Sequence, residues 1–306
     1  MELDLSNFTK KHITGKVLIA GSGGADSMAL IALCQDKGYL FEVAHLDHCL
    51  REESVDERKF VQGYCENNDI PFHYEEINPL THEGTSNNLE SAAREVRYMW
   101  LEIIRERRGC QWILTAHHLD DQVETVIMRQ TRNSGIRGLR GIIEVDSDRK
   151  LLRPLLEVDK KTLEAYLKER GINHVVDISN FDTEYTRNNI RHTVLPSLSL
   201  DDKYKYLYSA REATESYSQI KLQVEQGNHI KSTQSGNKYI NTDVIDMEYG
   251  FFIVENLMGR AIDKEEWTNV CNVAKGRVKT INMKKTNTLV FKDNDRLIFR
   301  TRKLMN

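Results

Sequence analysis

The feature that most constrains the fold is an apolar run followed by a glycine-rich loop and a helical pattern. The apolar run is Val17–Ala20, the loop is Gly21–Ser27, and the helical pattern starts at Met28. A strand that enters a helix through such a loop is typical of the units that build parallel sheets. Glycines let the main chain approach an anion closely, and the helix N-terminus supplies partial positive charge. The loop therefore predicts a phosphate site.

The loop differs from two common phosphate-binding patterns. It fits neither G-x-G-x-x-G nor G-x-x-x-x-G-K-S/T, because it has no lysine and places Asp26 at the start of the helix. A carboxylate beside phosphates is explained by a Mg²⁺ ion that bridges them, which makes Asp26 the candidate metal ligand. The alternative is that Asp26 or Ser27 only caps the helix, a function that does not require Ser-Gly-Gly before it.

The first 115 residues alternate short β-rich runs with longer helical patterns. This alternation predicts an α/β domain with a doubly wound parallel sheet. Strands are predicted at Lys16–Gly21, Phe41–Asp47, Phe72–Glu76 and Trp112–Thr115, and helices near Ser27–Lys37, Val55–Asn67, Asn88–Arg107 and Asp120–Arg132.

The alternation stops after Pro196, and the polar, helix-prone stretch Leu198–Gln226 predicts a connecting helix. Helices near Phe251–Ala261 and Lys264–Ala274 and β-rich runs near Val278–Met283, Thr288–Phe291 and Leu297–Arg300 then predict a small α+β domain. We expect a catalytic domain over 1–197, a connecting helix over 198–230 and a small basic domain over 231–306.

The charges are unevenly distributed although the net charge is only −3. The segment Phe41–Leu80 has 3 basic and 10 acidic residues, whereas Arg260–Asn306 has 12 basic and 5 acidic residues. The C-terminal segment is therefore a candidate surface for nucleic-acid phosphates. The alternative is an ordinary solvated charged face.

The sequence also excludes several classes of protein. The first residues are acidic where a signal peptide is basic, and no apolar run approaches the roughly twenty residues that span a bilayer. Five cysteines, at 34, 49, 65, 110 and 271, form no C-x-x-C pair, which argues against a disulfide framework or a thiolate metal site. We expect a cytoplasmic protein with reduced thiols and no membrane partner.

Polar residues follow the second predicted strand, where ligands bind in doubly wound sheets. His45 and Asp47 are candidates to contact a nucleotide, and the alternative is a zinc site formed by His45, His48 and Cys49. On the following helix, Arg94, Arg97 and Tyr98 share one side and could meet a phosphate or a base edge. The alternative for the arginines is that they only cover apolar neighbours.

The fourth predicted strand leads into a group of acidic residues. His117, Asp121 and Glu124 share a helical face if the helix begins near His117. Carboxylates that point toward bound phosphates indicate a cationic partner, either a metal ion or an ammonium substrate. Further along, Arg132, Arg137 and Arg140 alternate with glycines in a pattern that suits a loop over an RNA backbone.

Together these segments resemble a known enzyme family. The S-G-G-x-D-S loop resembles the PP-loop of the ATP-pyrophosphatase superfamily, whose members cleave ATP between the α and β phosphates. Three further motifs, H-x-D-H-x-L-R from 45, A-H-H-x-D-D-x-x-E-T from 116 and D-x-S-N-x-D-x-x-Y-x-R-N-x-I-R from 177, are similar to those of tRNA(Ile)-lysidine synthetases. The likeness covers about residues 16 to 196. The usual R-G-x-G loop of the family reads R-N-S-G from Arg132 here, and the C-terminal part matches only loosely.

The resemblance implies a ligase that joins L-lysine to C2 of the wobble cytidine of tRNA(Ile) with a CAU anticodon, through an adenylated cytidine, with release of pyrophosphate and AMP. It implies that Mg²⁺ is held by Asp26 and that ATP is bound by Ser22, Gly23, Gly24, Ala25, Asp26, Ser27, His45 and Asp47. It implies that catalysis involves Asp26, Arg97, His117, Asp121 and Glu124, with Asp121 and Glu124 also binding lysine. It implies that tRNA is bound by Arg94, Arg97, Arg132, Arg137, Arg187 and Arg191.

Two other functions remain open at this point. One is another PP-loop adenylating enzyme that modifies RNA, and the other is a non-catalytic relative that only binds tRNA. Thiolating relatives are disfavoured, because they would be expected to contain cysteine pairs that this chain lacks. The sequence also leaves open whether the chain forms a homodimer.

Overall fold

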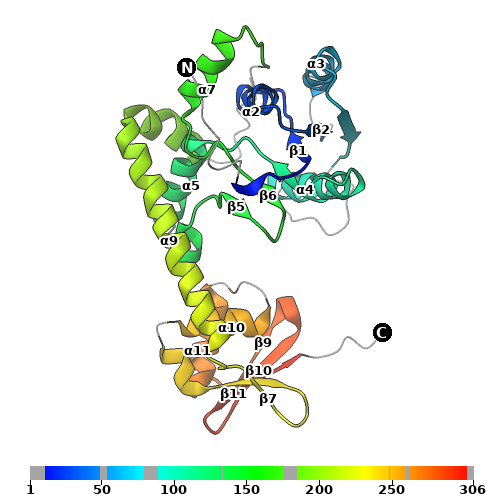
Figure 1. Ribbon diagram of the computed structural model, residues 1–306. Coiled ribbons are helices and arrows are strands. Elements are labelled where there is room, and N and C mark those ends of the chain that lie inside the picture. The colour runs from blue at the N-terminus through cyan, green and yellow to red at the C-terminus, as the bar shows by residue number, and fades with distance from the viewer. Residues whose placement is uncertain are drawn as a thin grey trace. The chain divides into compact units, whose positions relative to one another are not determined.

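The computed structural model describes residues 11–48, 54–78, 89–132, 134–175, 185–247, 249–259, 262 and 264–301. The chain forms two compact units, Met1–Thr214 and Glu215–Asn306. The boundary between them falls within the long helix α9 (Leu200–Gln226), which the sequence predicted as a connecting helix (Figure 1). None of the helices in the described ranges has the length and apolar character needed to cross a bilayer.

The N-terminal unit contains a six-stranded sheet with the order β3-β2-β1-β4-β6-β5. The strands are β1 (Val17–Ala20), β2 (Phe41–Asp47), β3 (Phe72–Glu76), β4 (Trp112–Leu114), β5 (Val145–Asp146) and β6 (Leu151–Leu152). All pairs are parallel except β5 with β6. This topology confirms the predicted doubly wound α/β fold, and the four predicted strands are correct to within one residue at either end. The two-residue strands β5 and β6 were not predicted, because they are too short to produce a periodic pattern.

Helices cover both faces of this sheet. On one face, α2 (Ala25–Asp36), α3 (Ser54–Asn67) and α7 (Lys160–Glu169) enclose a core with Ile19, Leu114 and Leu152. On the other face, α4 (Leu89–Arg107) packs on the alternate strand residues Leu18, Ile113 and Leu151. The alternation follows from the pleat, because successive side chains of a strand point to opposite faces.

A third helical group lies after β4. Here α5 (Leu119–Thr131) packs through Val123 and Met128 against the π-helical turn η2 (Ile190–Val194) and the 3₁₀ turn η3 (Leu195–Ser197). The short helices α6 (Ile136–Leu139) and α8 (Tyr185–Asn189) contact the same helix. The strand order reverses between β1 and β4, so the loops into α2 and α5 start side by side at the carboxyl edge of the sheet. Ligands of open α/β sheets bind at this position.

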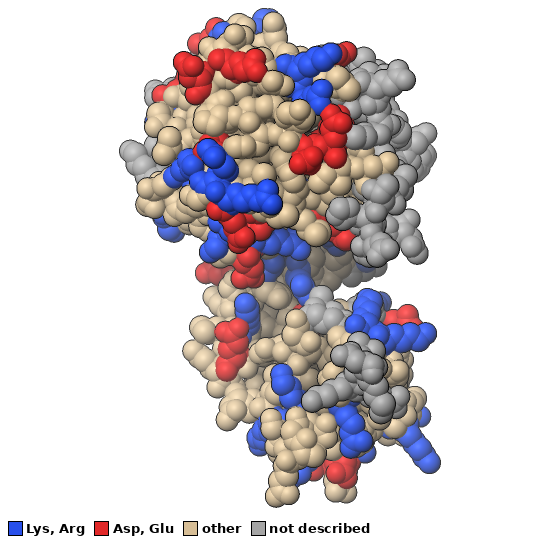
Figure 2. Space-filling view, turned by 90° about the vertical axis from the view of Figure 1, so that its right-hand side faces the viewer, with Lys and Arg blue, Asp and Glu red and all other residues tan. Residues whose placement is uncertain are grey.

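The C-terminal unit is an antiparallel sheet with two helices, which confirms the predicted small α+β domain. Its strand order is β7-β8-β11-β10-β9. The elements are β7 (Lys231–Ser232), β8 (Lys238–Asn241), η4 (Thr242–Asp246), α10 (Gly250–Met258), α11 (Lys264–Ala274), β9 (Thr280–Met283), η5 (Lys284–Thr286), β10 (Thr288–Asp293) and β11 (Arg296–Thr301). Strands β7 and β8 were not predicted, because their sequences, Lys-Ser and Lys-Tyr-Ile-Asn, contain little apolar character. On the face drawn in Figure 2, the side chains of Lys and Arg predominate over those of Asp and Glu in this unit.

Candidate active site at the carboxyl ends of β1 and β4

The glycine loop between β1 and α2 is held in shape by a buried serine. The hydroxyl oxygen of Ser27 accepts hydrogen bonds from the main-chain N–H groups of Ser22 and Gly23, at 3.2 and 3.1 Å, and Ser27 Oγ donates to Gly24 O at 3.0 Å. Ser27 therefore braces the loop from inside. The amides that remain for an anion are those of the first turn of α2, because the first N–H groups of a helix have no intrahelical partner.

Two glycines of the loop are required by its geometry. A Cβ atom on Gly21 would lie 2.8 Å from Val43 Cγ1. Gly23 has a φ of +86°, which residues other than glycine rarely adopt. The carbonyl oxygen of Gly23 also accepts a hydrogen bond from the Val175 N–H at 2.9 Å. The loop is thus fixed on both sides, and side chains at these two positions would disturb it.

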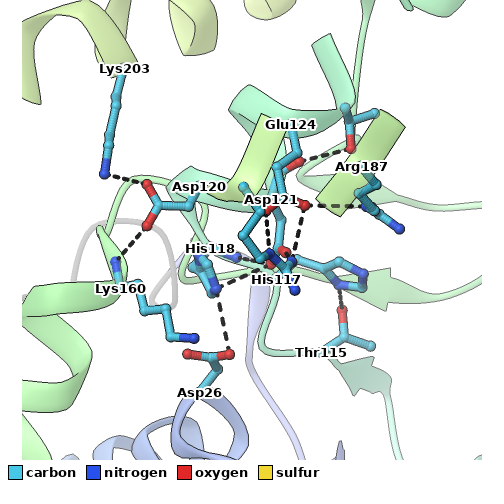
Figure 3. A network of polar contacts seen from close by, with 12 residues as sticks. Asp26, Thr115, His117, His118, Asp120, Asp121, Glu124, Lys160, Arg187 and Lys203 are labelled. Carbon is cyan, nitrogen blue, oxygen red and sulfur yellow. Dashed lines mark hydrogen bonds and ion pairs between the residues drawn. The ribbon is translucent and has the colours of Figure 1, made fainter. Parts of the chain in front are cut away.

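His118 joins the loop to the helix that follows β4. Its Nε2 lies 3.5 Å from Asp26 Oδ2 and 3.5 Å from Asp121 Oδ2. Figure 3 shows the buried imidazole of His118 directed toward Asp26. The main-chain N–H of His118 donates to Asp121 Oδ2 at 3.0 Å, so that Asp121 also caps the start of α5. Asp26 and Asp121, which lie 95 positions apart in the sequence, thus both face the imidazole of His118.

The charges of His118 and Asp26 shift each other's pKa values toward the charged forms. Burial alone would lower the pKa of His118, but the nearby carboxylates of Asp121 and Asp26 outweigh burial and raise that pKa above its usual value. Burial would likewise raise the pKa of Asp26, but His118, Lys160 and Arg191 outweigh burial and lower the pKa. Asp26 is therefore ionised and surrounded by cations.

Glu124 lies on the same side of α5 as Asp121, and two arginines donate hydrogen bonds to its carboxylate. Its side chain is only 1% exposed. Arg191 donates from Nε to Glu124 Oε1 at 2.7 Å and from Nη2 to Oε2 at 3.0 Å, and Arg187 Nε donates to Oε2 at 3.2 Å. Arg191 Nη2 also lies 3.7 Å from Asp121 Oδ1. The cationic partner of this carboxylate is therefore supplied by the chain itself, and its role as a lysine ligand stays a prediction.

Two lysines that the sequence analysis did not select lie beside this group. Lys160, the first residue of α7, has an exposed side chain that extends toward Asp26 in Figure 3. Lys203 of α9 is buried and pairs with Asp120 Oδ1 at 2.5 Å, and the Lys160 N–H donates to Asp120 Oδ2 at 3.4 Å. Asp120 thus links the starts of α5, α7 and α9.

His117 points the other way from His118 and lies outside the helix. The helix begins at Leu119, so His117 does not share a helical face with Asp121 and Glu124, and the conditional prediction of a common face is wrong for this residue. Its Nδ1 lies 2.8 Å from Thr115 Oγ1 (Figure 3). Burial lowers the pKa of His117 to about 4, so the imidazole is neutral near pH 7.

The tip of β2 contributes two further predicted residues. His45 Nδ1 donates to Gly21 O at 2.9 Å, and burial lowers the pKa of His45. Asp47 is buried at the end of the same strand. Arg97 of α4 donates from Nη2 to His48 Nε2 at 3.2 Å. The segment of the second motif from Cys49 to Arg51 lies outside the described residues.

The remaining arginines predicted to bind tRNA lie in different places. Arg94 contacts Tyr98 on α4, with its Nη2 3.3 Å from Tyr98 Oη. Arg132 is the C-cap of α5 and Arg137 lies in α6, about 20 Å along α5 from the phosphate loop. The structure therefore does not bring Arg132 and Arg137 to the loop. Residues 176–184, which include most of the D-x-S-N-x-D motif, lie outside the described residues.

Comparisons with known proteins agree with this site. A family model described as a PP-loop domain matches residues 1–198. The tRNA(Ile)-lysidine synthase of Petrotoga mobilis is 30% identical over 289 residues, and the match covers 90% of this chain and 92% of that relative. The chain belongs to the tRNA(Ile)-lysidine synthase family. Because that match covers 90% of the chain, it includes much of the C-terminal unit, which matched only loosely in the sequence analysis.

Other members of the family are longer. The tRNA(Ile)-lysidine synthase of Bacteroides thetaiotaomicron is 40% identical over 192 residues, which are 61% of this chain and 45% of the relative. The chain spans less than half the length of this and two similar curated relatives. Among solved structures, the U34-tRNA thiolase NcsA from Methanococcus maripaludis has a TM-score of 0.56, is 15% identical, and is matched over 69% of this chain and 78% of its own. That likeness concerns the fold alone.

The residues of this lysidine synthase family member fit a magnesium ion at Asp26. Asp26 Oδ1 is buried and has no hydrogen-bond partner in the described structure. Mg²⁺ prefers oxygen ligands and is commonly held by one or two carboxylates together with substrate phosphates and water. No cluster of three or more histidine, cysteine or acidic residues suited to a metal occurs among the described residues. Asp26 is thus suited to hold a metal ion whose remaining ligands are substrate phosphates and water.

Two residues of this site in the lysidine synthase fold were missed by the sequence analysis for different reasons. His118 lies inside the motif from 116, and the alternation of side chains after β4 could have separated its direction from that of His117. Lys160 has no such signal, because it is one of two adjacent lysines at the start of an ordinary amphipathic helix. Only the packing of α7 beside α2 brings it to Asp26.

Proposed function

We propose that this chain is an ATP-dependent ligase that joins L-lysine to C2 of the wobble cytidine of tRNA(Ile) with a CAU anticodon. The observation that carries the proposal is the convergence of the phosphate loop and the acidic start of α5 on one imidazole, with Asp26 and Asp121 each 3.5 Å from His118 Nε2. Membership of the lysidine synthase family supports the choice of reaction. The intermediate is an adenylated cytidine.

In the first step, the chain holds ATP so that the cytosine O2 attacks the α-phosphorus and pyrophosphate leaves. The first-turn amides of α2 bind the phosphates, and Lys160 and Arg191 add positive charge on the side of Asp26. A Mg²⁺ ion held by Asp26 would neutralise part of the phosphate charge. Ser22, Gly23, Gly24, Ala25 and Ser27 shape the loop, and His45 and Asp47 flank it at the tip of β2.

In the second step, the deprotonated ε-amine of lysine attacks C2 of the base, the C2–O2 bond breaks, and AMP leaves with that oxygen. Asp121 is the proposed partner of a lysine ammonium group, because its Oδ1 has only a 3.7 Å contact with Arg191. His117, which is neutral near pH 7, belongs to the same cluster as Asp121 and can form a hydrogen bond without adding charge. We place Arg97 beside the cytosine, where its guanidinium can donate to O2.

The proposed partner is tRNA, and the charge distribution supports a division of the contacts. Arg94, Arg97, Arg187 and Arg191 lie close to the site and would meet the anticodon loop, whereas Arg132 and Arg137 would contact more distant phosphates. Exposed cations of the C-terminal unit, among them Lys279 and Lys284, form a further candidate phosphate surface. We place the protein in the cytoplasm with its tRNA substrate.

The proposal is tested with purified protein, ATP, L-lysine and an unmodified tRNA(Ile) transcript that carries a CAU anticodon. We expect mass spectrometry of the digested RNA to find lysidine, and AMP and pyrophosphate to form in equal amounts only when all three substrates are present. The control transcript has a GAU anticodon and lacks the wobble cytidine. Release of AMP with lysine but without tRNA would favour another adenylating enzyme, and tRNA binding without pyrophosphate release would favour a non-catalytic relative.

A further inference from the structure

One face of the C-terminal sheet lies opposite to the face that packs on α10 and α11. The residues of β8, β10 and β11 that point into the hydrophobic core with these helices are Ile240, Val290, Leu297 and Phe299. Successive side chains of a strand point to opposite faces, so Tyr239, Phe291 and Ile298 point away from that core. None of these three residues belongs to the hydrophobic cluster that the helices cover. We call the surface that they share the open face.

The strand register places outward side chains in one row across all five strands. Tyr239 is paired with Lys231 and with Ile298, and Phe291 is paired with Ile298 and with Thr280. Neighbouring strands lie about 4.8 Å apart, so the two aromatic rings, which are two strands apart, are about 10 Å from each other. Ile298 between them is only 7% exposed, whereas both rings are partly exposed. The centre of the open face therefore presents two rings on either side of a buried isoleucine.

Each of the two rings has an arginine over it. Arg296 Cζ lies 5.0 Å from the centroid of the Tyr239 ring, and Arg300 Cζ lies 5.4 Å from the centroid of the Phe291 ring. The two arginines stand two residues before and two residues after Ile298 on β11, so they point to the open face as well. Both are exposed, and neither forms an ion pair with another described residue. Their charges are thus available to a partner.

The charges of the open face favour an anionic partner. The strand register assigns to it the cations Lys231, Arg296 and Arg300 and one carboxylate, Asp293. All three cations are exposed. A surface with this excess of positive charge attracts a polyanion.

The pairing of rings with arginines suits unpaired nucleotides better than a duplex. In a duplex the bases are stacked on one another, so a protein reaches phosphates, sugars and base edges but not base faces. Unpaired bases can stack on aromatic rings while cations bind the neighbouring phosphates. An apolar protein partner is less suited, because the aliphatic residues of the open face on the described strands are Leu289 and Ile298, and Ile298 is already buried.

We propose that the open face binds unpaired nucleotides of the tRNA substrate, with bases stacked on Tyr239 and Phe291 and phosphates bound by Arg296 and Arg300. The inference rests on the proposed function for the choice of tRNA as the source of these nucleotides. Because both arginines are exposed, each can turn from its ring to a phosphate and leave the ring to a base. Every base has a π face, so this binding depends little on the RNA sequence. The open face adds a contact that the exposed cations of this unit cannot make by charge alone.

The test measures the binding of two RNA probes to the full-length protein by fluorescence anisotropy. One probe is a single-stranded decamer of uridine, and the other is a ten-base-pair RNA duplex. Tyr239→Leu and Phe291→Leu each remove one ring and keep an apolar side chain. We expect each variant to bind the decamer at least about fivefold more weakly than the wild type, because one stacked base is lost, and to bind the duplex as the wild type does.

Three further variants separate stacking from charge and from any exposed ring. Tyr239→Phe keeps the ring and should bind the decamer as the wild type does. Tyr208→Leu is the matched control, because Tyr208 is 55% exposed on α9 in the other unit, and it should change the affinity for neither probe. Arg300→Gln should weaken the binding of both probes and lower the slope of log affinity against log salt by about 0.7 to 0.9, which corresponds to one phosphate contact.

Wild-type affinity for the decamer in both leucine variants would overturn the proposal. The two rings lie on different strands, so one leucine variant with an unchanged melting temperature is sufficient for this test. Sedimentation that shows a dimer of the wild type but a monomer of Phe291→Leu would also overturn it, because a second copy of the chain would then occupy the open face.

The ligation assay separates this proposal from the proposed function. The leucine variants should raise the KM for tRNA and leave kcat unchanged. Ring-dependent binding of the decamer by a wild-type protein that forms no lysidine would leave the open face standing and refute the proposed function instead. Lysidine formation together with decamer binding that does not depend on the rings would refute the open face alone.

Discussion

Lys160→Ala gives the sharpest test of how the phosphate loop works, because the loop itself contains no lysine. The structure supplies this charge from α7, at the side of Asp26. The variant removes one charge-assisted hydrogen bond to a phosphate, worth about 1.5–3 kcal/mol in general. Since the Lys160 side chain is exposed and screened by solvent, the lower end of that range applies, which corresponds to an increase of about tenfold in the KM for ATP.

The matched control for this experiment is Lys161→Ala. Lys161 is also exposed and lies next in the same helix, but it points about 100° away around the helix axis. Both variants keep the main-chain N–H that Lys160 donates to Asp120, so the packing of α7 is preserved. We expect the KM of the Lys161 variant for ATP to match the wild type and the effect of Lys160→Ala to shrink in high salt. Equal KM values for the two variants would refute the assignment of Lys160 to the phosphates.

Four further predictions concern the site and its support. Asp26→Asn should lower tRNA-dependent ATP–pyrophosphate exchange by at least about 100-fold, because it removes the proposed metal ligand, and exchange near the wild-type rate would exclude that role. Glu124→Gln should impair ATP use at least as much as lysine use, because Glu124 holds Arg191 near Asp26, whereas a rise in the KM for lysine alone would identify Glu124 as a direct lysine ligand. Gly21→Ala should destabilise the N-terminal unit by about 1–3 kcal/mol, since its Cβ would lie 2.8 Å from Val43 Cγ1, and an unchanged melting temperature by calorimetry would contradict the packing. Glu42 has a pKa of about 2, because Arg108, Lys16 and His73 overcome the effect of burial. The contribution of this carboxylate to stability is therefore present above its pKa in the unfolded chain, about 4.5, and is lost as the pH falls toward 2. The difference in melting temperature between the wild type and Glu42→Gln should shrink over that pH interval.

The sequence determined the local elements and the chemistry of the motifs. Periodic apolar runs gave β2 and β3 with their observed bounds, and the glycines and Asp26 identified the anion-binding loop, because these signals depend on residues close together in the chain. The strands β5 and β6 escaped because two residues are too few to form a pattern. The helix after β4 was predicted near Asp120–Arg132 and begins at Leu119, so the condition that would have placed His117 on its face, a start near His117, is not met.

Only the tertiary structure decided which of these groups meet. Sequence spacing could not reveal that His118 lies between Asp26 and Asp121. It also could not reveal that Arg187 and Arg191 donate hydrogen bonds to Glu124, or that Lys160 lies near the phosphate loop. The pairing of β6 with β4 is likewise a contact between segments that are distant in the sequence. Such contacts arise from the packing of helices on a shared sheet, and the burial that drives this packing is not specific for the polar groups that it brings together.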